Sequence, residues 1–259
     1  MATPHLSIIT PVFNGIRFVE SCIKNVIDQV CDGLEHLIVD GGSSDGTVDV
    51  IRQYAARYPH IRWISEADHG QSDAMNKGVG LARGRILGFL NVDDYYDPGV
   101  LPEVVRMFDR LPEPTLLVGD CNIWDDDAKL LSVSKPAQIG LFSLLKGRYE
   151  DAFPMNSSAY FYHRSLHERI GPYVVGEVFA MDIHFIFKAV QQANVVYVNQ
   201  TFGNYRYLEG TRTFEDVKNG MNPVRVRKIT EDYRKQLPAH LRARLSLSEI
   251  WDRMRRVVR

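Results

Sequence analysis

The chain has few of the features that mark secreted, membrane-spanning or nucleic-acid-binding proteins. Its 259 residues include three cysteines, Cys22, Cys31 and Cys121, without the C-x-x-C spacing of zinc sites. The sequence contains no run of about eighteen apolar residues, the length needed to cross a membrane. Its start, MATPHLSIITPVFNG, lacks the basic residues of a signal peptide. The net charge of -1 predicts no general affinity for nucleic acid. We therefore expect buried thiols and a cytoplasmic protein that does not bind nucleic acid.

What the sequence does contain is typical of a globular protein. Apolar residues make up 45% of the chain and charged residues 24%, and 259 residues can bury a large core without disulfides. The charge is unevenly spread, because residues 224–259 hold eleven lysines or arginines against four acidic residues. We expect one α/β domain followed by a basic tail.

Short β-branched runs alternate with longer amphipathic stretches in the first half of the chain. We predict strands at 6–10, 35–40, 61–65 and 85–91, and helices at 18–30, 47–58 and 72–83. This alternation is typical of βαβ units and a parallel sheet. The pattern is less regular afterwards, with helices expected at 100–110 and 180–192, apolar segments at 115–119 and 158–162, and a last strand at 194–200.

Polar clusters follow the first four predicted strands. Their sequences are PVFNG, DGGSSDGT, EADHGQSD and VDD. In open parallel sheets the ligand binds beyond the carboxyl ends of the strands, where these clusters should meet.

The cluster DGGSSDGT, residues 40–47, has two interpretations. Asp45 or Thr47 can cap the following helix, whereas Asp40 can accept hydrogen bonds from a nucleobase or a ribose. The segment is not a phosphate-binding P-loop, because it lacks the lysine of that motif.

Two adjacent acids, Asp93 and Asp94, end the fourth predicted strand. On composition alone they could be solvated side chains before the turn at Pro98 and Gly99. A buried strand, however, would hold the two carboxylates together, and a divalent cation would relieve their repulsion. Oxygen ligands of this kind suit Mg²⁺ or Mn²⁺.

Taken together, several segments resemble the family 2 glycosyltransferases of the GT-A fold. They are, in order, SIITPVFNG, LIVDGGSSDGT, DHGQSDAMNKGVGLARGRILGFLNVDD and AMDIHF, and the resemblance covers roughly residues 6–210. It implies an α/β fold of the GT-A type, with a Rossmann-like, mostly parallel central sheet flanked by helices and a C-terminal helical extension. The expected domain is 1–214, with a nucleotide-sugar-binding half (1–105) and an acceptor-binding half (106–214), followed by a basic amphipathic helical tail (215–259).

The resemblance also implies an activity. Family members move a sugar from a nucleoside diphosphate sugar, here most simply a UDP-sugar, to a hydroxyl of a glycan or lipid-linked acceptor. They usually depend on Mn²⁺ or Mg²⁺ and invert the anomeric configuration. Because many family members act in bacterial surface polysaccharide biosynthesis, the resemblance implies this pathway as well.

The family pattern assigns expected roles to individual residues. Pro11 and Phe13 would pack on the nucleobase, Asp40 would bind the base or ribose, and Asp73 and Asn76 would line the nucleoside and sugar. Asp93 would bind the ribose or sugar. Asp94 would be the metal ligand, with His184 as a further candidate.

Two expected roles fall in the second half of the chain. Asp182, in the first turn of a predicted helix, would be the general base, although an acid there also stabilises the helix dipole. Arg206 or Arg212 would meet the diphosphate. Three residues depart from the family pattern at positions where acids are common, namely Gly41, Asn91 and Met181.

Two other functions remain open on the sequence. The departures are compatible with a catalytically silent sugar-nucleotide-binding subunit of a polysaccharide assembly. A sugar-1-phosphate nucleotidyltransferase is disfavoured, because no glycine-rich loop with Arg or Lys follows the first strand.

The tail is predicted to form two or three helices, about 215–236 and then beyond Pro238. Apolar residues recur at helical spacing in the last helix, at Leu247, Ile250, Trp251, Met254, Val257 and Val258, and the other face carries Arg253, Arg255, Arg256 and Arg259. Such a helix can pack on the domain, form an oligomer contact or lie on an anionic membrane. A membrane contact would place the protein at the inner face of the cell membrane.

Overall fold

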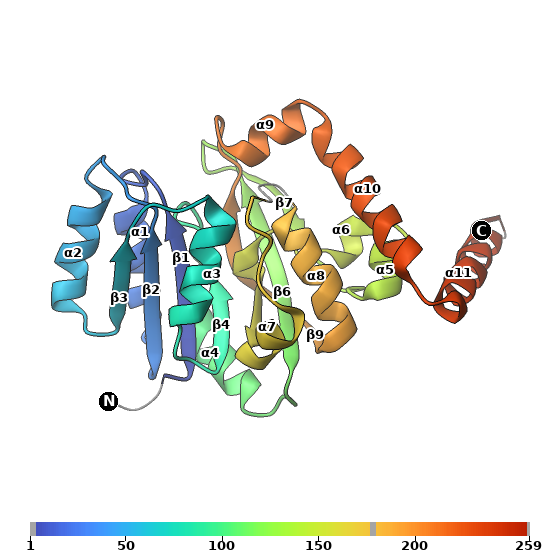
Figure 1. The fold of residues 1–259 in the computed structure, drawn as a ribbon, viewed down its shortest axis with the longest axis horizontal. Helices are drawn as coiled ribbons and strands as arrows, with labels where there is room; N and C mark the ends of the chain where they lie inside the picture. Colours follow the sequence, from blue (N-terminus) through green and yellow to red (C-terminus); the bar gives the residue numbers. More distant parts are fainter. Residues whose placement is uncertain (1–3, 177–179, 258–259) are drawn as a thin grey trace.

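The computed structural model describes residues 4–176 and 180–257, and one sheet runs through both halves of the domain (Figure 1). Four parallel strands occupy one side of it in the order β3-β2-β1-β4. They are β1 (Leu6–Val12), β2 (Leu34–Asp40), β3 (Ile61–Ser65) and β4 (Ile86–Phe89). Each lies where the sequence predicts a strand, and β1 continues two residues further than expected.

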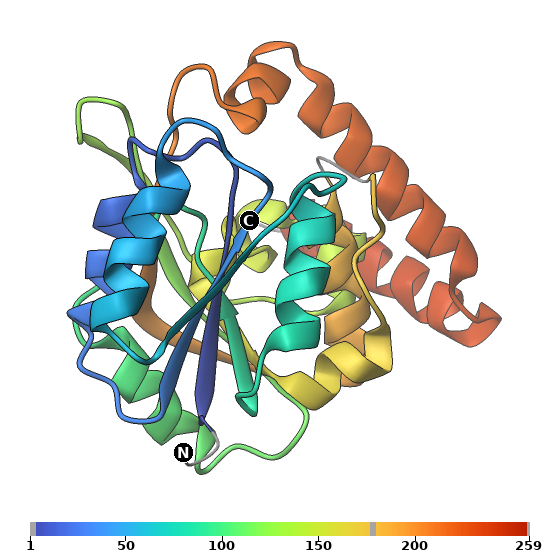
Figure 2. The ribbon, with the colours of Figure 1, turned by 60° about the vertical axis from the view of Figure 1, so that its left-hand side comes forward.

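Helices cover both faces of these strands, which explains why β1 and β2 are buried at every position. Figure 2 shows α1 (Val19–Ile27) and α2 (Thr47–Arg57) on one face and α3 (Gln71–Leu81) on the other. Successive residues of β1 point to opposite faces. Ile8 therefore packs with Val26 of α1, whereas Ile9 packs with Met75 of α3.

The second half extends the same sheet with a mixture of strand directions. It contributes β8 (Tyr160–His163), antiparallel to β4, then β6 (Thr115–Trp124), antiparallel to β8, and β9 (Asn194–Arg206), parallel to β6. Two short strands were not predicted, β5 (Tyr95–Tyr96) and β7 (Leu130–Ser134). The first has two residues and the second is mostly exposed, so neither produces an apolar run.

Helices of the second half cover this part of the sheet. They are α4 (Val100–Phe108), α5 (Leu141–Leu145), α6 (Tyr149–Ala152), the 3₁₀ turn η1 (Ser157–Ala159), α7 (Arg164–Ile170) and α8 (Met181–Gln192). The fold is thus the predicted α/β architecture with a C-terminal helical region. Two of the three cysteines, Cys22 and Cys121, are buried thiols, and Cys31 is half-buried.

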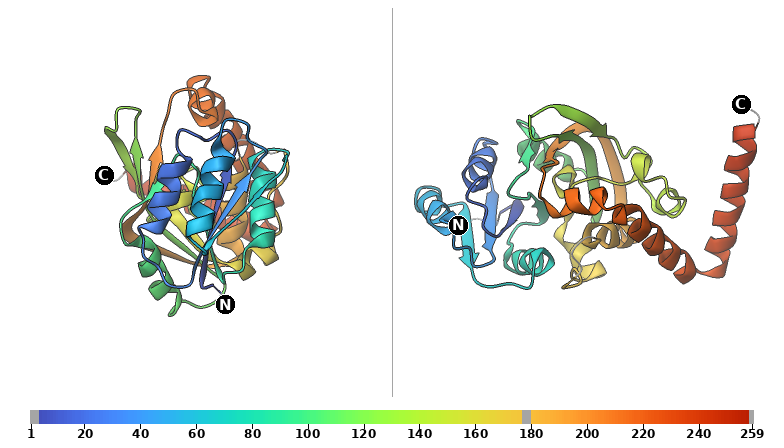
Figure 3. Two further views of the ribbon diagram at one scale, coloured as in Figure 1. Left: turned by 90° about the vertical axis from the view of Figure 1, so that its left-hand side faces the viewer. Right: turned by 90° about the horizontal axis from the view of Figure 1, so that it is seen from above.

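The tail forms three helices, α9 (Arg212–Lys218), α10 (Met221–Gln236) and α11 (Ala239–Val257). The predicted helix at 215–236 is interrupted at Gly220, which adopts a left-handed φ of 66°. The expected boundary after residue 214 falls inside α9. Figure 3 shows α10 leading away from the sheet and α11 lying at the far end of the molecule.

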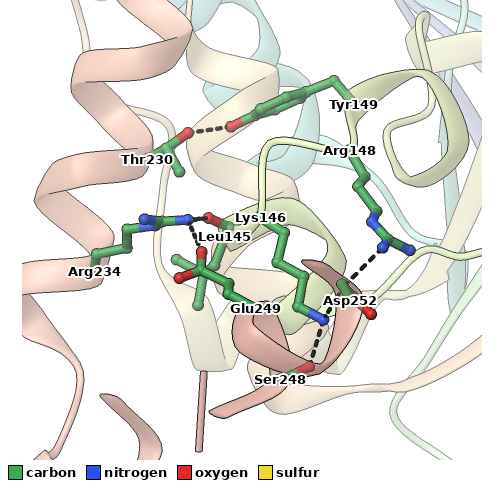
Figure 4. A network of polar contacts seen from close by, with 9 residues as sticks. All are labelled: Leu145, Lys146, Arg148, Tyr149, Thr230, Arg234, Ser248, Glu249 and Asp252. Atoms are coloured by element: carbon green, nitrogen blue, oxygen red, sulfur yellow. Dashed lines mark hydrogen bonds and ion pairs between the residues drawn. The ribbon is translucent and has the colours of Figure 1, made fainter. Parts of the chain in front are cut away.

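One face of α11 is held to the domain and to α10 by ion pairs (Figure 4). Asp252 accepts from Lys146 at 2.9 Å and from Arg148 at 2.7 Å. Glu249 accepts from Arg234 at 2.6 Å, and the same guanidinium binds the carbonyl oxygen of Leu145. The tail thus contacts the domain through the acidic face of α11, whereas packing was expected of its apolar face.

The opposite face of α11 remains exposed to solvent. It presents the expected apolar residues Leu247, Ile250, Trp251 and Met254. Val258 and Arg259 lie outside the described residues, and the side chains of Arg253, Arg255, Arg256 and Val257 are not described. Within the described ranges, no helix is both long and apolar enough to span a bilayer.

Candidate active site

A cavity of about 430 Å³ opens at the carboxyl ends of the parallel strands. The end of β1 contributes Pro11 and Phe13 to its wall, the segment after β3 contributes Asp68, and the segment after β4 contributes Asn91 and Asp93. Residues 210–213, at the start of α9, form another part of the wall. The polar clusters after β1, β3 and β4 therefore meet at one edge of the sheet, as the sequence predicts.

A second cavity, of about 140 Å³, reaches from this region toward the start of α8. Asp182 and Asp216 lie in its wall. The two cavities share five lining residues, Gln71, Asn91, Tyr205, Arg212 and Thr213. They are consequently adjacent parts of one site, and the first helix of the tail helps to form both.

The two adjacent acids after β4 face different surroundings. Asp93 lines the larger cavity, whereas Asp94 is 2% exposed. The carboxylate of Asp94 accepts from the side-chain amides of Asn91 at 3.0 Å and Asn156 at 2.8 Å, and from the backbone N–H of Arg206 at 3.0 Å. The carboxylate that is open to a ligand is therefore that of Asp93, not of the expected metal ligand Asp94.

Burial makes this pair of acids electrostatically costly. Loss of solvation raises the pKa of both, and the charge of Asp93 raises the pKa of Asp94 further. The guanidinium of Arg206 acts in the opposite direction and lowers the pKa of Asp93. A cation at the cavity wall beside Asp93 would relieve the repulsion within the pair.

The residues present fit a divalent ion only if the ligand supplies other oxygens. The described parts of the chain contain no group of three or more His, Cys, Asp or Glu side chains that could hold a metal ion. His184, the second predicted metal ligand, lies on α8 with its Nδ1 3.3 Å from the hydroxyl of Tyr233. It lines neither cavity of the candidate site, so the structure does not bring it to Asp94.

Asp40 is buried, and its carboxylate is fully engaged by its own chain. One oxygen accepts from the backbone N–H groups of Gly42 and Ser43, both at 3.0 Å, and from the hydroxyl of Ser65 at 2.7 Å. The other accepts from the Ser43 hydroxyl. Asp40 does not line the cavity. In this geometry it orders the loop after β2 instead of presenting a free carboxylate to a nucleotide.

Asp73 and Asn76 of α3 also point to protein partners. Asp73 accepts from the backbone N–H of His69 at 3.1 Å and pairs with Lys77 at 3.5 Å. Asn76 exchanges two hydrogen bonds with the backbone of Tyr173, at 2.8 and 2.9 Å. Neither residue lines either cavity, and their neighbours Gln71 and Ala74 take that position.

Of the two candidate arginines, only Arg212 lines the site. It borders both cavities from the first residue of α9. The guanidinium of Arg206 instead lies over the rings of Phe18 and Tyr95, 5.7 and 5.0 Å from their centroids. Arg206 therefore contributes through its charge near Asp93 and its backbone N–H to Asp94.

Asp182 occupies the first turn of α8 and borders the second cavity. The hydroxyl of Tyr160 donates to its Oδ1 at 3.4 Å. Desolvation raises the pKa of Asp182 to about 6, and the hydrogen bond from Tyr160 partly opposes this rise. A carboxyl group with such a pKa is ionised at neutral pH and is a better proton acceptor than an ordinary aspartate.

Sequence reasoning did not single out Asp68, Gln71 or Tyr205, which line the larger cavity. Asp68 and Gln71 belong to the cluster EADHGQSD, so the position after β3 was a usable signal. Tyr205 lies on β9, which the pairings with β6 and with β5 bring to the site.

A family model described as glycosyl transferase family 2 matches residues 7–170. The chain is 28% identical over 223 residues to the uncharacterized glycosyltransferase EpsJ of Bacillus subtilis, covering 83% of this chain and 64% of EpsJ. EpsJ and other similar curated relatives are longer than this chain, which spans between 31% and 64% of their length.

Two solved structures share the fold at low sequence identity. TarS 1-349 from S. aureus, in complex with UDP-GlcNAc, has a TM-score of 0.66 and 16% identity over 81% of this chain and 60% of its own. The mannosyltransferase PcManGT from Pyrobaculum calidifontis, in complex with GDP-Man and Mn²⁺, has a TM-score of 0.54 and 19% identity, covering 80% and 57%.

Proposed function

Because the chain belongs to glycosyl transferase family 2, we propose that it transfers a sugar from a nucleoside diphosphate sugar to a hydroxyl group of an acceptor. The observation that carries this proposal is the pair of adjoining cavities. The larger one has Asp93 and Arg212 in its wall, and the smaller one, which shares Arg212, has Asp182. This arrangement provides a place for a diphosphate next to a carboxylate that can accept a proton.

The larger cavity is proposed to hold the donor. Phe13 is 63% exposed at its wall, next to Pro11, and a nucleobase packed on that ring would cover it. The likeness to TarS, which binds UDP-GlcNAc, supports a UDP-sugar as donor.

The diphosphate is proposed to lie between Asp93 and Arg212. Mn²⁺ or Mg²⁺ would be held by Asp93 together with phosphate oxygens, since hard oxygen ligands suit these ions. When bound, the ion would stabilise the negative charge of the departing nucleoside diphosphate. The guanidinium of Arg212 can donate to the same phosphates. Three N–H donors hold the carboxylate of Asp94 behind Asp93, and a bound cation would favour its ionised form, which burial and the charge of Asp93 otherwise disfavour.

Asp182 is the proposed general base. Its carboxylate accepts the proton of the acceptor hydroxyl while the acceptor oxygen bonds to the anomeric carbon and the bond from that carbon to the diphosphate breaks. One in-line displacement of this kind inverts the anomeric configuration and needs no second carboxylate as nucleophile. Asp216, the other acid of the second cavity, is bound to Arg225 through two hydrogen bonds, which supports Asp182 as the base.

The acceptor is proposed to be a glycan or a lipid-linked sugar of a bacterial surface polysaccharide pathway. The relation to chains such as EpsJ of Bacillus subtilis supports a bacterial setting.

The exposed face of α11 is proposed to rest on the anionic inner surface of the cell membrane. Glu249 and Asp252, the two acids of the helix, are bound to Arg234, Lys146 and Arg148. The outer face keeps apolar side chains that include Trp251, with exposed Arg242 and Arg244 on the same helix. A helix that combines an exposed apolar face with exposed arginines suits an anionic bilayer, whereas a second copy of this basic tail would repel it.

Calorimetric titration with UDP, GDP, CDP, ADP and dTDP, with and without Mn²⁺, tests the donor assignment. We expect micromolar binding of one nucleotide that strengthens on adding Mn²⁺. Failure of every nucleotide to bind would contradict the proposal. Binding without release of nucleoside diphosphate from any sugar nucleotide would instead indicate a silent binding subunit, and preferential turnover of nucleoside triphosphates would indicate a nucleotidyltransferase.

A further inference from the structure

Gly41, directly after β2, lies against Asp68, which follows the neighbouring strand β3. A Cβ atom added to Gly41 would lie 2.5 Å from Oδ2 of Asp68, too close unless the carboxylate moves, and 3.1 Å from its Cγ. The carboxylate of Asp68 therefore fills the space that a side chain at position 41 would take. Gly41, unlike Gly42, does not have a positive φ, so room for Asp68 and not backbone conformation accounts for the glycine.

The carboxylate of Asp68 is positioned but not saturated. Its Oδ1 accepts from the backbone N–H of Gly70 at 2.8 Å, which fixes the side chain. Within the described residues, no hydrogen-bond donor reaches Oδ2. Asp68 is half-buried and lines the larger cavity, so a bound molecule can reach the open oxygen.

Asp68 differs in this respect from the other acids near the nucleotide pocket. The oxygens of Asp40 are all engaged within the loop after β2. Asp93 and Asp68 are the two acids in the described wall of the larger cavity, and Asp93 belongs with Arg206 and the buried Asp94. Asp68 is thus the remaining carboxylate in this wall that could accept a hydrogen bond from an N–H group of the nucleobase.

We propose that Asp68 reads the base of the donor nucleotide by accepting a hydrogen bond from the imide N3–H of uracil. This inference rests on the proposed function and names the group of the base that the site recognises, an imide N–H that uracil shares with thymine. One open carboxylate oxygen matches the single N–H of the uracil imide, while the exposed ring of Phe13 in the same wall packs on the face of the base. Guanine offers two neighbouring N–H donors, and the contact of Oδ1 with the N–H of Gly70 favours a base that presents only one.

The test compares UDP with N3-methyl-UDP, whose imide has no hydrogen to donate, in calorimetric titrations with Mn²⁺. For the wild-type chain we expect methylation to weaken binding by about tenfold or more, because a charged acceptor is left unpaired. For Asp68→Ala we expect weaker UDP binding and no further loss on methylation. The control Glu66→Ala, at an exposed acid in the same loop, should behave as wild type.

Moving the acid to the neighbouring strand gives a second, independent test. Gly41→Ala should displace the Asp68 carboxylate and weaken UDP binding as Asp68→Ala does, while the double variant Gly41→Asp with Asp68→Ala should recover at least part of the lost affinity. Thermal unfolding of each variant establishes that it is folded.

The possible failures are distinguishable. UDP binding that is indifferent to N3 methylation would overturn the role of Asp68 and leave the proposed function standing, and tighter binding of GDP than of UDP would overturn the choice of uracil. Failure of all nucleoside diphosphates to bind would overturn both the inference and the proposed function.

Discussion

The phenolic oxygen of Tyr160 lies 3.4 Å from Oδ1 of Asp182, and it links the buried centre of the sheet to the wall of the second cavity. Tyr160 is completely buried on β8. Its hydroxyl therefore contacts the Asp182 carboxylate from the protein interior. The side of that carboxylate that faces the cavity remains open to an acceptor.

Replacing Asp182 with asparagine should lower turnover by about 10²- to 10⁴-fold, the range expected for loss of a general base. Donor affinity should change little, because Asp182 borders the smaller cavity and not the larger one. Release of nucleoside diphosphate measures the first quantity and calorimetry the second. Asp49→Asn, at an exposed acid of α2, serves as the control, and near-normal turnover of Asp182→Asn would end the assignment.

The pH profile should report the ionisation of Asp182. Only the deprotonated carboxylate accepts a proton, so kcat/KM for the acceptor should fall as the pH is lowered through about 6, the pKa to which desolvation raises this group. The hydrogen bond from Tyr160 lowers that pKa. Tyr160→Phe should therefore move the acidic limb to higher pH, and an unmoved limb would exclude Asp182 as its origin.

Arg212 should matter more for donor binding than Arg206. Loss of a charged hydrogen bond to the diphosphate in Arg212→Ala should weaken UDP binding by about 1.5–3 kcal/mol, roughly 10- to 100-fold. Arg206→Ala should cost less, because its guanidinium lies over Phe18 and Tyr95 and not at the cavity wall. Calorimetry with UDP and Mn²⁺ measures both, and the reverse order of effects would favour Arg206 as the phosphate-binding residue.

The two acids after β4 should respond differently to removal of their charge. Asp93→Asn should abolish the effect of Mn²⁺ on UDP affinity, since Asp93 is the acid that faces the cavity. Asp94→Asn should mainly destabilise the fold, by about 1–3 kcal/mol, because its new NH2 group would face a donor in either orientation, the backbone N–H of Arg206 or the amides of Asn91 and Asn156. Titrations with and without Mn²⁺, together with thermal unfolding, separate these effects. A stable Asp94→Asn chain without metal dependence would restore Asp94 as the ligand.

The exposed face of α11 should bind anionic vesicles. We expect the chain to sediment with phosphatidylglycerol-containing vesicles and not with pure phosphatidylcholine, and Trp251→Glu should weaken binding by about tenfold or more. Gln53→Glu adds the same charge on α2, away from the tail, and should have no effect. Equal binding of wild type and Trp251→Glu, or none by the wild type, would contradict the membrane assignment.

The sequence was sufficient to predict the parallel half of the fold, because each strand there is a short segment rich in apolar residues that is followed by a helix. The same logic placed Pro11, Phe13 and Asp93 at the sheet edge, where the structure finds them in one cavity wall. It did not predict β5, which has two residues and pairs with the distant strand β9, or β7, which is mostly exposed and forms a hairpin with its neighbour β6.

Side-chain direction is what the sequence could not provide. Asp40 follows its strand as predicted, yet Ser65, from the end of the neighbouring strand, occupies one of its oxygens. Asn76 lies on the expected helix, yet it binds the backbone of Tyr173, which is 97 residues away. Conversely, Asp68 can take its position in the cavity wall because Gly41 has no side chain to occupy the same space. Such relations depend on which distant segments meet, and a motif in one segment does not contain them.

The most direct test of the central claim is release of nucleoside diphosphate from a sugar nucleotide by the purified chain, with Mn²⁺ and an acceptor extract of bacterial glycans and lipid-linked sugars. We predict release from one class of donor, with appearance of the matching glycosylated product, and its loss in Asp182→Asn. Absence of release and of product from every sugar nucleotide, or undiminished release by Asp182→Asn, would contradict the account.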